Sequence, residues 1–396
     1  MSSRRNFIGA TAALPLIATQ ASAAKLKTPD YFKDLGIRPF INAAGTYTML
    51  TASLMSQETM DAMEYASKHF VHLTKLQDAV GARIANLLSA EAAMVTSGAA
   101  GAMMVGTAGC ITGTDNKAIL QLPDITGLKS EVLVQKSHRY GYDHAVRACG
   151  VKLVEIETEE DFHLKSGPQT AMALFFNDNE SKGKIDAKGW VRLGKQHKVP
   201  TFNDASADAL PVERLSLYNK MGFDLVTFSG GKCICAPQSS GILMGRKDLI
   251  EAARLNTSPY SDTVGRGLKV NKEEMLGLLV ALENYLKRDH AAEAREWDRR
   301  VDLITKAAKK LPSVTSKVDV PEIANHTPHL KLTWDQSKIK ISPLDVKKQL
   351  LESEPSIEVT PSTSKDELVV TVWMLKPGEA EIVARRIAEV LKAATA

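Results

Sequence analysis

Short apolar runs alternate with amphipathic stretches between residues 80 and 250. The apolar runs have the length of strands, and the amphipathic stretches have the spacing of helices that bury one face. The predicted helices are 99–110, 140–149 and 187–197, and the predicted strands are 92–95, 131–134, 151–156, 171–176, 200–204, 223–229 and 240–244. Strands that alternate with helices indicate an α/β fold with a mainly parallel sheet.

The last third of the chain has a different organisation. Residues 272–310 predict one or two long amphipathic helices, and strands at 329–333, 357–359 and 368–374 with helices at 343–351 and 378–394 predict a small α+β domain. Residues 41–54 are too polar for a core segment and are expected to be irregular. The resulting division is a signal peptide (1–23), an N-terminal segment (24–68), a large domain (69–270), connecting helices (271–310) and a small C-terminal domain (311–396).

Composition narrows the class of protein. The chain has 396 residues, of which 44% are hydrophobic and 24% charged, so it is globular rather than disordered, collagen-like or a coiled coil. Lys and Arg number 50 against 46 Asp and Glu, a net charge of +4. Because acids intersperse the basic residues, we expect no nucleic-acid partner.

The first residues resemble an export signal. Arg4 and Arg5 precede a short, weakly hydrophobic run, and Ala21-Ser22-Ala23 is an A-x-A cleavage pattern. The run is far shorter than the ~20 apolar residues of a membrane-spanning helix, and no cysteine follows the cleavage pattern, so we expect no stable membrane anchor. The twin arginines resemble a Tat signal, which implies a periplasmic protein that is exported already folded and is suited to carrying a cofactor. An ordinary basic N-terminus and a general secretory signal are the alternatives.

The four cysteines are too few for a disulfide scaffold. Their apolar or small-residue surroundings predict buried free thiols. Cys233 and Cys235 have C-x-C spacing, but no set of His or Cys partners suggests zinc, so no metal is expected.

Three groups of polar residues follow predicted strands. Asp204 ends one strand, Ser229-Gly230-Gly231-Lys232 ends the next, and Ser97-Gly98-Ala99 joins a strand to a helix. Ligands of open α/β sheets bind at these carboxyl ends. A lysine there can form a Schiff base, an aspartate can hold a protonated pyridine nitrogen, and a helix N-terminus can bind phosphate. Each group alone is a weak signal, but together they describe pyridoxal 5′-phosphate (PLP).

At these residues the chain resembles fold-type I PLP-dependent enzymes of the aspartate aminotransferase superfamily. More narrowly it resembles the SelA-like branch, which includes selenium transferases and an amino sugar acid ammonia-lyase. The resemblance rests on segments 41–47, 76–81, 95–100, 138–147, 224–232, 236–241 and 245–250. It implies a mainly parallel seven-stranded sheet flanked by helices, followed by the small α+β domain.

The resemblance also implies roles for individual residues. Lys232 would bind PLP covalently and Asp204 would hold its pyridine nitrogen. Ser97, Gly98 and Ala99 would form the phosphate cup, with the Ser229 hydroxyl beside it. The remaining candidates are His138 as a ring-stacking catalytic residue, Gln238 near the cofactor, and Asn42, Thr46, Tyr47 and Arg266 as substrate-binding residues. His138 as a polar residue at a helix start, Gln238 as a turn cap and Arg266 as a solvated loop charge are the alternatives.

The implied function is chemistry at Cα of an amino acid or amino sugar acid. We expect α,β-elimination, which gives a keto acid and ammonia, with racemase or epimerase and aminotransferase activity as alternatives, and a non-catalytic binding protein as a further one. Related enzymes build each active site from two subunits, so a homodimer or larger homo-oligomer is expected. Selenium transfer is not expected, because the signal leaves little room for a tRNA-handling domain and export separates the enzyme from tRNA.

Overall fold

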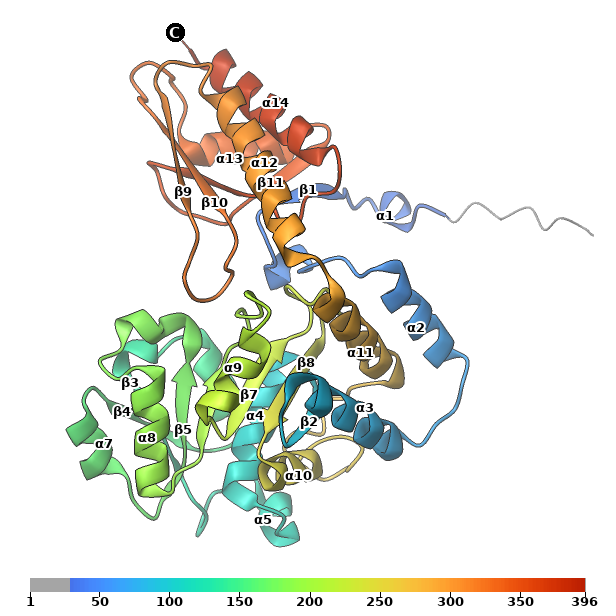
Figure 1. Cartoon of the computed structure of the whole chain (residues 1–396), viewed down its shortest axis with the longest axis vertical. Coiled ribbons are helices and arrows are strands. Elements are labelled where there is room, and N and C mark those ends of the chain that lie inside the picture. The colour runs from blue at the N-terminus through green and yellow to red at the C-terminus, as the bar shows by residue number, and fades with distance from the viewer. Residues whose placement is uncertain (1–28, 396) are drawn as a thin grey trace, which may run out of the picture. The chain divides into compact units, whose positions relative to one another are not determined.

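The computed structural model of the chain describes residues 29–395 (Figure 1). The first compact unit ends at Pro39, and its described part holds one helical turn, α1 (Tyr31–Asp34), where the Asp30 side chain accepts a hydrogen bond from Lys33 N. The second unit begins at Phe40 and holds the other described elements. The predicted signal peptide, residues 1–23, lies outside the described residues. No helix of the described part is both long and apolar enough to cross a membrane.

A seven-stranded sheet forms the centre of the large domain. Its strand order is β2-β8-β7-β6-β5-β3-β4, and β8 alone among the seven runs antiparallel to its neighbours. The bounds are β2 (Ala92–Ser97), β3 (Glu131–Gln135), β4 (Lys152–Ile156), β5 (Thr170–Phe176), β6 (Thr201–Asp204), β7 (Leu225–Ser229) and β8 (Ser240–Gly245). The expected mainly parallel seven-stranded sheet is confirmed, and the carboxyl ends of β2, β7 and β6 lie at one edge.

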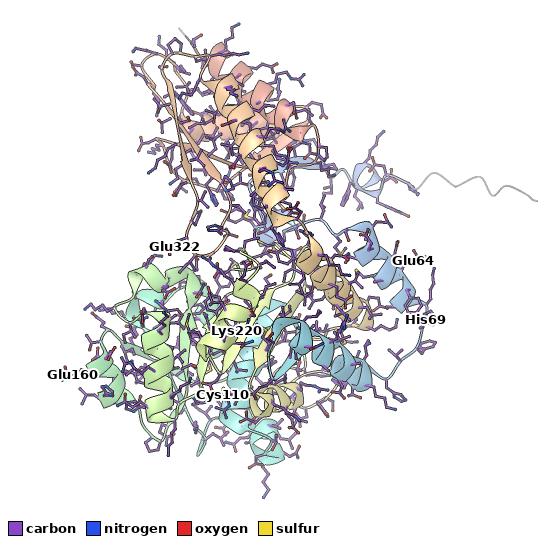
Figure 2. The ribbon with its side chains drawn as sticks, viewed as in Figure 1. Glu64, His69, Cys110, Glu160, Lys220 and Glu322 are labelled. Carbon is purple, nitrogen blue, oxygen red and sulfur yellow. The ribbon has the colours of Figure 1, made fainter. Side chains whose placement is uncertain are left out.

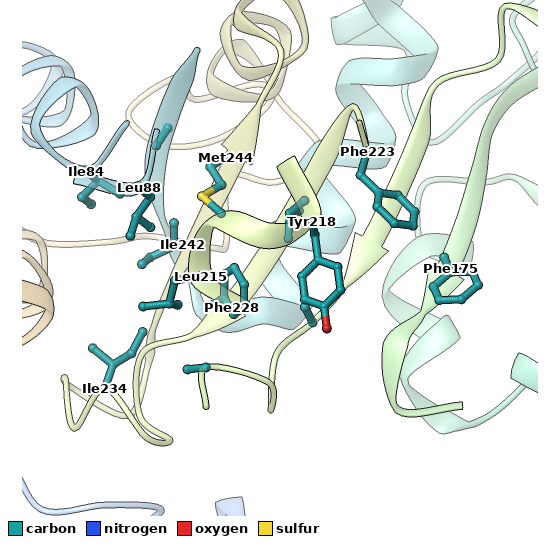
Figure 3. Packing of buried hydrophobic residues seen from close by; sticks show 14 of the residues in the cluster. Ile84, Leu88, Phe175, Leu215, Tyr218, Phe223, Phe228, Ile234, Ile242 and Met244 are labelled. Carbon is teal, nitrogen blue, oxygen red and sulfur yellow. The ribbon is translucent and has the colours of Figure 1, made fainter. Parts of the chain in front are cut away.

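Both faces of the sheet are buried. Successive residues of a strand point to opposite faces, so Phe175 joins one core cluster while Leu174 and Phe176 join the other. Figure 3 shows the first cluster, in which Ile84, Leu215 and Tyr218 from covering helices pack near Phe228, Ile242 and Met244 of the strands. Burial on both faces explains why these strands read as continuous apolar runs.

Helices cover the two faces of the sheet. The first face is covered by α3 (Leu73–Leu88), α7 (Glu159–Lys165), α8 (Ala187–His197), α9 (Arg214–Met221) and α11 (Lys272–Lys287), and the second by α4 (Gly98–Thr112), α6 (His144–Arg147) and α10 (Lys247–Leu255). Helix α2 (Gln57–Ser67) packs on α11, and α5 (Asn116–Gln121) packs on α4.

Helix α3 fixes the edge strand β2. A β-carbon on Gly81 would lie 2.2 Å from the Ala93 carbonyl oxygen, so only glycine permits this approach. The Gln77 side chain then bonds both backbone groups of Val95, donating to its O at 2.7 Å and accepting from its N at 3.0 Å. These contacts place the end of β2, and with it Ser97, relative to the rest of the sheet.

The small domain draws on both ends of the second unit. Strand β1 (Phe40–Ala43) pairs in parallel with β11 (Ser356–Val359), beside a three-stranded sheet of β9 (Val314–Asp319), β10 (His329–Trp334) and β12 (Leu368–Thr371). Its helices are α12 (His290–Ala308), α13 (Pro343–Glu352) and α14 (Glu379–Ala393). Val301 and Ile304 of α12 belong to the same core cluster as Ile41 and Val359. Helix α12 therefore packs as part of the small domain.

Some local expectations were wrong. Residues 41–54 contain strand β1 and a 3₁₀ turn at Thr48–Leu50, because pairing with β11 supplies the hydrogen bonds that the short strand lacks on its own. The helix expected at 140–149 is a 3₁₀ turn at Gly141–Asp143 followed by the short α6. The segment between β6 and β7 contains helix α9, which was not expected.

Candidate active site

From the last residue of β6 onwards, polar and apolar residues alternate in the order Asp204-Ala205-Ser206-Ala207-Asp208. Asp204 is 5% exposed, and its Oδ1 accepts a hydrogen bond from Ser206 N at 3.0 Å. Ser206 O in turn accepts from Ser229 N, at the end of β7, at 3.2 Å. These hydrogen bonds hold the end of β6 next to the end of β7, as expected for parallel strands that follow one another in the chain.

Lys232 follows β7 in a turn that depends on two glycines. A β-carbon on Gly230 would lie 2.3 Å from Ser240 Oγ, and one on Gly231 would lie 2.6 Å from Gln238 Cα. This close packing turns Lys232 back over the end of β6. Its Nζ donates to Ser206 Oγ at 3.4 Å. Ser206 therefore contacts both predicted catalytic residues, Asp204 and Lys232.

Burial dominates the electrostatics of this pair. It raises the pKa of Asp204, an effect opposed by the charge of Lys232. It lowers the pKa of Lys232, an effect opposed by the charge of Asp204. A lysine amine with a lowered pKa is more often neutral at pH 7, which is the state needed for a nucleophile or a base. A buried carboxylate in this position suits a cationic N–H donor.

Lys232 and Asp204 open into a cavity of about 220 Å³. Both domains contribute to its wall. Polar groups dominate the residues that line it, which are Ala44, Gly45, Thr46, Tyr47, Thr48, Tyr140, Tyr142, Asn177, Asp178, Asp204, Ala205, Ser206, Ala207, Asp208, Lys232, Ala324, Asn325, His329 and Trp373. Substrate-sized polar molecules could therefore be bound within reach of Lys232.

The predicted phosphate cup lies along the same edge of the sheet. Ser97 pairs with Ser240, and Ser229 pairs with Gly241, so the two serines are separated by β8 alone. Gly98 begins α4 with a φ of +69°, and the first turn of this helix presents free backbone N–H groups. Ser97 and Gly98, followed by Ala99, thus have the geometry of a phosphate-binding helix start, although they do not line the cavity itself.

The substrate-binding candidates separate into two groups. Thr46 and Tyr47 line the cavity. Asn42 does not: its Oδ1 accepts from Ala44 N and Gly45 N, at 3.0 and 2.9 Å, and so shapes the turn that presents them. Gln238 is exposed, and its Nε2 donates to Thr48 O at 2.9 Å. Asn42 and Gln238 therefore hold the backbone of residues that line the cavity and do not line it themselves.

His138 and Arg266 lie outside the cavity. His138 is fully buried, its ring packs edge-on against Phe175 at 4.7 Å, and its Nδ1 accepts from Phe176 N at 3.2 Å. The ring-stacking position expected for it is not seen in this geometry, because hydrogen bonds within the core hold the imidazole there. Tyr140, two residues further on, lines the cavity instead. Arg266 is half-buried in a loop after α10.

Several cavity residues were not predicted. Ser206 and Asp208 had a signal in the sequence, since they are polar residues that come directly after the end of a predicted strand. Asn177 and Asp178 directly follow β5 and could have been found by the same rule for strand ends. His329 and Asn325 come from the small domain, and no local pattern places them near Lys232.

The residues present fit PLP. Asp204 supplies a buried carboxylate for the pyridine nitrogen, and Lys232 supplies an amine for the aldehyde. The start of α4 and the Ser229 hydroxyl supply hydrogen-bond donors for the phosphate. These three groups follow β6, β7 and β2 at one edge of the sheet, with β8 between the last two, which is the arrangement that a planar cofactor with three different polar substituents requires.

Comparisons with known proteins agree with this fit. The family model described as SelA, L-seryl-tRNA selenium transferase, matches residues 40–389. A D-glucosaminate-6-phosphate ammonia lyase of Salmonella typhimurium is 26% identical, over 92% of this chain and 98% of its own. A solved structure of a D-glucosaminate-6-phosphate ammonia-lyase has a TM-score of 0.80 at 25% identity, covering 93% of this chain and all of that one.

Two further proteins show the breadth of the fold. A 5′-C-glycyluridine monooxygenase-decarboxylase of a Streptomyces species is 28% identical, over 91% of this chain and 92% of its own. A serine palmitoyltransferase of S. paucimobilis with bound PLP has a TM-score of 0.56 at 13% identity, covering 90% of this chain and 88% of that one, and shares the fold. The expected fold and cofactor are confirmed, and the chain belongs to the SelA family of fold-type I PLP-dependent enzymes.

Proposed function

We propose that the protein is a PLP-dependent lyase that eliminates ammonia from an amino acid or amino sugar acid. The observation that carries the proposal is the pair of half-buried Lys232 and buried Asp204, which together line a polar cavity. The full-length similarity to an ammonia lyase supports it. The products would be a keto acid and ammonia.

Lys232 is the residue placed to move a proton at Cα. Burial lowers the pKa of its amine below the ordinary lysine value, which favours the neutral form that can accept a proton. PLP, when bound, supplies an electron-withdrawing ring that acidifies this Cα–H bond. Asp204 would hold the ring nitrogen in its protonated form by accepting its N–H, and Ser206 N keeps the carboxylate in place. Ser206 Oγ also orients the amine of Lys232.

The departing hydroxyl of the substrate needs a donor. Tyr140 and Tyr47 line the cavity, and burial raises the pKa of both phenols, so each keeps its proton at neutral pH. His329 donates its Nδ1 proton to Thr327 O at 2.8 Å, and burial lowers its pKa. The neutral imidazole lines the cavity beside the two phenols. The cavity thus offers hydroxyl donors and a neutral imidazole to the carbons beyond Cα.

A screen of D- and L-amino acids and amino sugar acids, including D-glucosaminate 6-phosphate, tests the proposal. Release of ammonia with a keto acid would support it. An inverted amino acid without ammonia would indicate a racemase or epimerase, and transfer of the amino group to a second keto acid would indicate an aminotransferase. Binding of PLP without any turnover would favour a non-catalytic binding protein. Lys232→Ala serves as the control that removes the reactive amine.

We also propose that the active enzyme is a homodimer or larger homo-oligomer. Large apolar side chains are exposed over a stretch of adjacent sequence, at Met49 (80%), Leu54 (64%), Tyr65 (62%) and Phe70 (106%). Apolar groups in such number favour burial against a partner. In such an oligomer, Arg266 would contribute to the active site of a neighbouring subunit. Light scattering of Phe70→Glu and wild type tests this, and a wild-type monomer that turns over substrate would contradict it.

Export is a separate proposal, motivated by Arg4, Arg5 and the A-x-A pattern. Replacing both arginines by lysine should leave folded, PLP-containing precursor in the cytoplasm, as measured by cell fractionation. Normal accumulation of that variant in the periplasm would contradict a Tat signal.

A further inference from the structure

A turn from the small domain forms part of the cavity wall. It joins β9 to β10, and its residues Ala324 and Asn325 line the cavity. Both have left-handed backbones, with φ of 60° and 47°. Non-glycine residues hold such conformations where surrounding contacts stabilise them. Figure 2 labels Glu322 in this turn, which points from the small domain towards the large one.

Contacts with the segment after β6 supply that stabilisation. Asn325 N donates to Ala207 O at 2.8 Å, and Ala324 N donates to Asp208 Oδ1 at 3.0 Å. Arg214, from α9, reaches both sides: its Nη1 pairs with Asp208 Oδ1, and its Nη2 donates to Glu322 O at 2.6 Å. The turn is therefore held by one backbone carbonyl, by the Asp208 carboxylate and by the arginine that pairs with that carboxylate.

The Asp208 carboxylate accepts hydrogen bonds from four donors. Its Oδ2 accepts from Tyr218 OH and, at 2.9 Å, from Asn177 Nδ2, while its Oδ1 serves Arg214 and Ala324 N. The side chain is 1% exposed. An ionised carboxylate can accept from all four donors, whereas an amide of the same shape offers one acceptor oxygen and two N–H donors. The ionised form is thus required for the full set of contacts.

The same short segment carries the cofactor residues. Asp204 and Ser206 precede Asp208 by four and two residues, so the turn is anchored to the backbone that positions Lys232. Small-domain side chains are in this way fixed relative to the reacting atoms.

We propose that Asp208 is a positioning residue for substrate: it docks the turn around Ala324 on the segment after β6, and thereby places Asn325 and His329 as the substrate-facing wall. The inference rests on the proposed function in one respect, that this cavity binds the substrate. Asp208 acts through the turn and not by contact with PLP.

Two measurements on the PLP-bound enzyme test the proposal with Asp208→Asn. The first is cleavage by a glutamate-specific protease after Glu322, which lies within the turn. Loss of charge-assisted hydrogen bonds should undock the turn and speed this cleavage roughly tenfold. The second is the kinetics with D-glucosaminate 6-phosphate, where KM should rise roughly tenfold while kcat and the visible spectrum of bound PLP stay near the wild-type values.

Asp224→Asn is the matched control. Asp224 also accepts from backbone and hydroxyl donors of Thr201 and pairs with an arginine, Arg246, but it lies at the opposite edge of the sheet. It should change neither measurement. Arg214→Lys keeps the charge but loses the forked contact, so it should speed cleavage after Glu322 without altering the visible spectrum of bound PLP. This variant replaces Asp208→Asn in the test if Asp208→Asn does not fold.

Wild-type cleavage after Glu322 in both variants would overturn the proposal, as would a fall in kcat with unchanged KM. If wild type does not turn over D-glucosaminate 6-phosphate, the proposed substrate class fails, and the cleavage assay still decides whether Asp208 docks the turn.

Discussion

Replacing Asp204 by asparagine tests the charge of this residue while preserving its shape. The amide oxygen can keep the 3.0 Å hydrogen bond from Ser206 N. The negative charge is lost in a site where the side chain is 5% exposed. A hydrogen bond to a charged group contributes about 1.5–3 kcal/mol, and more where a buried partner is left unpaired. A loss of about 3 kcal/mol corresponds to roughly a hundredfold in rate.

This loss should fall on kcat. The protonated ring matters most as the Cα–H bond breaks, so KM should change little. The assay is the initial rate of ammonia release at saturating PLP, with Asp224→Asn as a control expected to stay within about threefold of wild type. Wild-type kcat in Asp204→Asn would refute the reasoning. Either the chemical step then needs no protonated ring, which favours a racemase, or it is not rate-limiting.

Lys232→Ala should abolish turnover and the PLP that borohydride fixes to the protein; a retained adduct in mass spectrometry would assign the reactive amine to another residue. Gly241→Ala should weaken PLP binding, measured by equilibrium dialysis, because the added β-carbon would lie 2.5 Å from the Gly98 carbonyl carbon at the start of α4. Unchanged affinity would show that the start of α4 does not bind the cofactor. Burial lowers the pKa of His138 to about 4, below the ~6.5 of an unfolded chain, so the unfolded state takes up its proton first as pH falls. This contribution to the free energy of unfolding is fully present above about pH 6.5 and is lost towards pH 4, and the loss at pH 4.5 should be about 2.5 kcal/mol. His138→Gln should remove this loss, as measured by urea unfolding across the pH range. An unchanged pH dependence would contradict the assignment to His138.

The parts of the fold that sequence could predict are those with strong local patterns. The helix at residues 187–197 has clear periodicity, and the strands of the large sheet are short continuous apolar runs. Their parallel order brings Asp204 next to the end of β7. Strand β1 has four residues and a partner near the other end of the chain, so its pairing leaves no local signal.

The candidate site divides in the same way. Lys232 and Asp204 follow from strand ends and glycines. The sequence could not decide where His138 points, because a polar residue after a strand can face a cavity or the core; in the structure it is buried and accepts a hydrogen bond from Phe176 N. Asn325 and His329 depend on how the small domain docks, which is a long-range contact that periodicity does not encode.

The pairing of β1 with β11 bears on when the enzyme becomes competent during its synthesis. Every residue of the large domain leaves the ribosome before Ser356–Val359, the partner of β1, has been made. Domains fold as units as they emerge, and contacts distant in sequence form late. The large sheet can therefore assemble while Phe40–Ala43 is still unpaired, and Thr46 and Tyr47, tethered directly behind that strand, take their places over Lys232 among the last events of folding. A nascent chain would thus carry an open, unfinished cavity until translation is nearly complete.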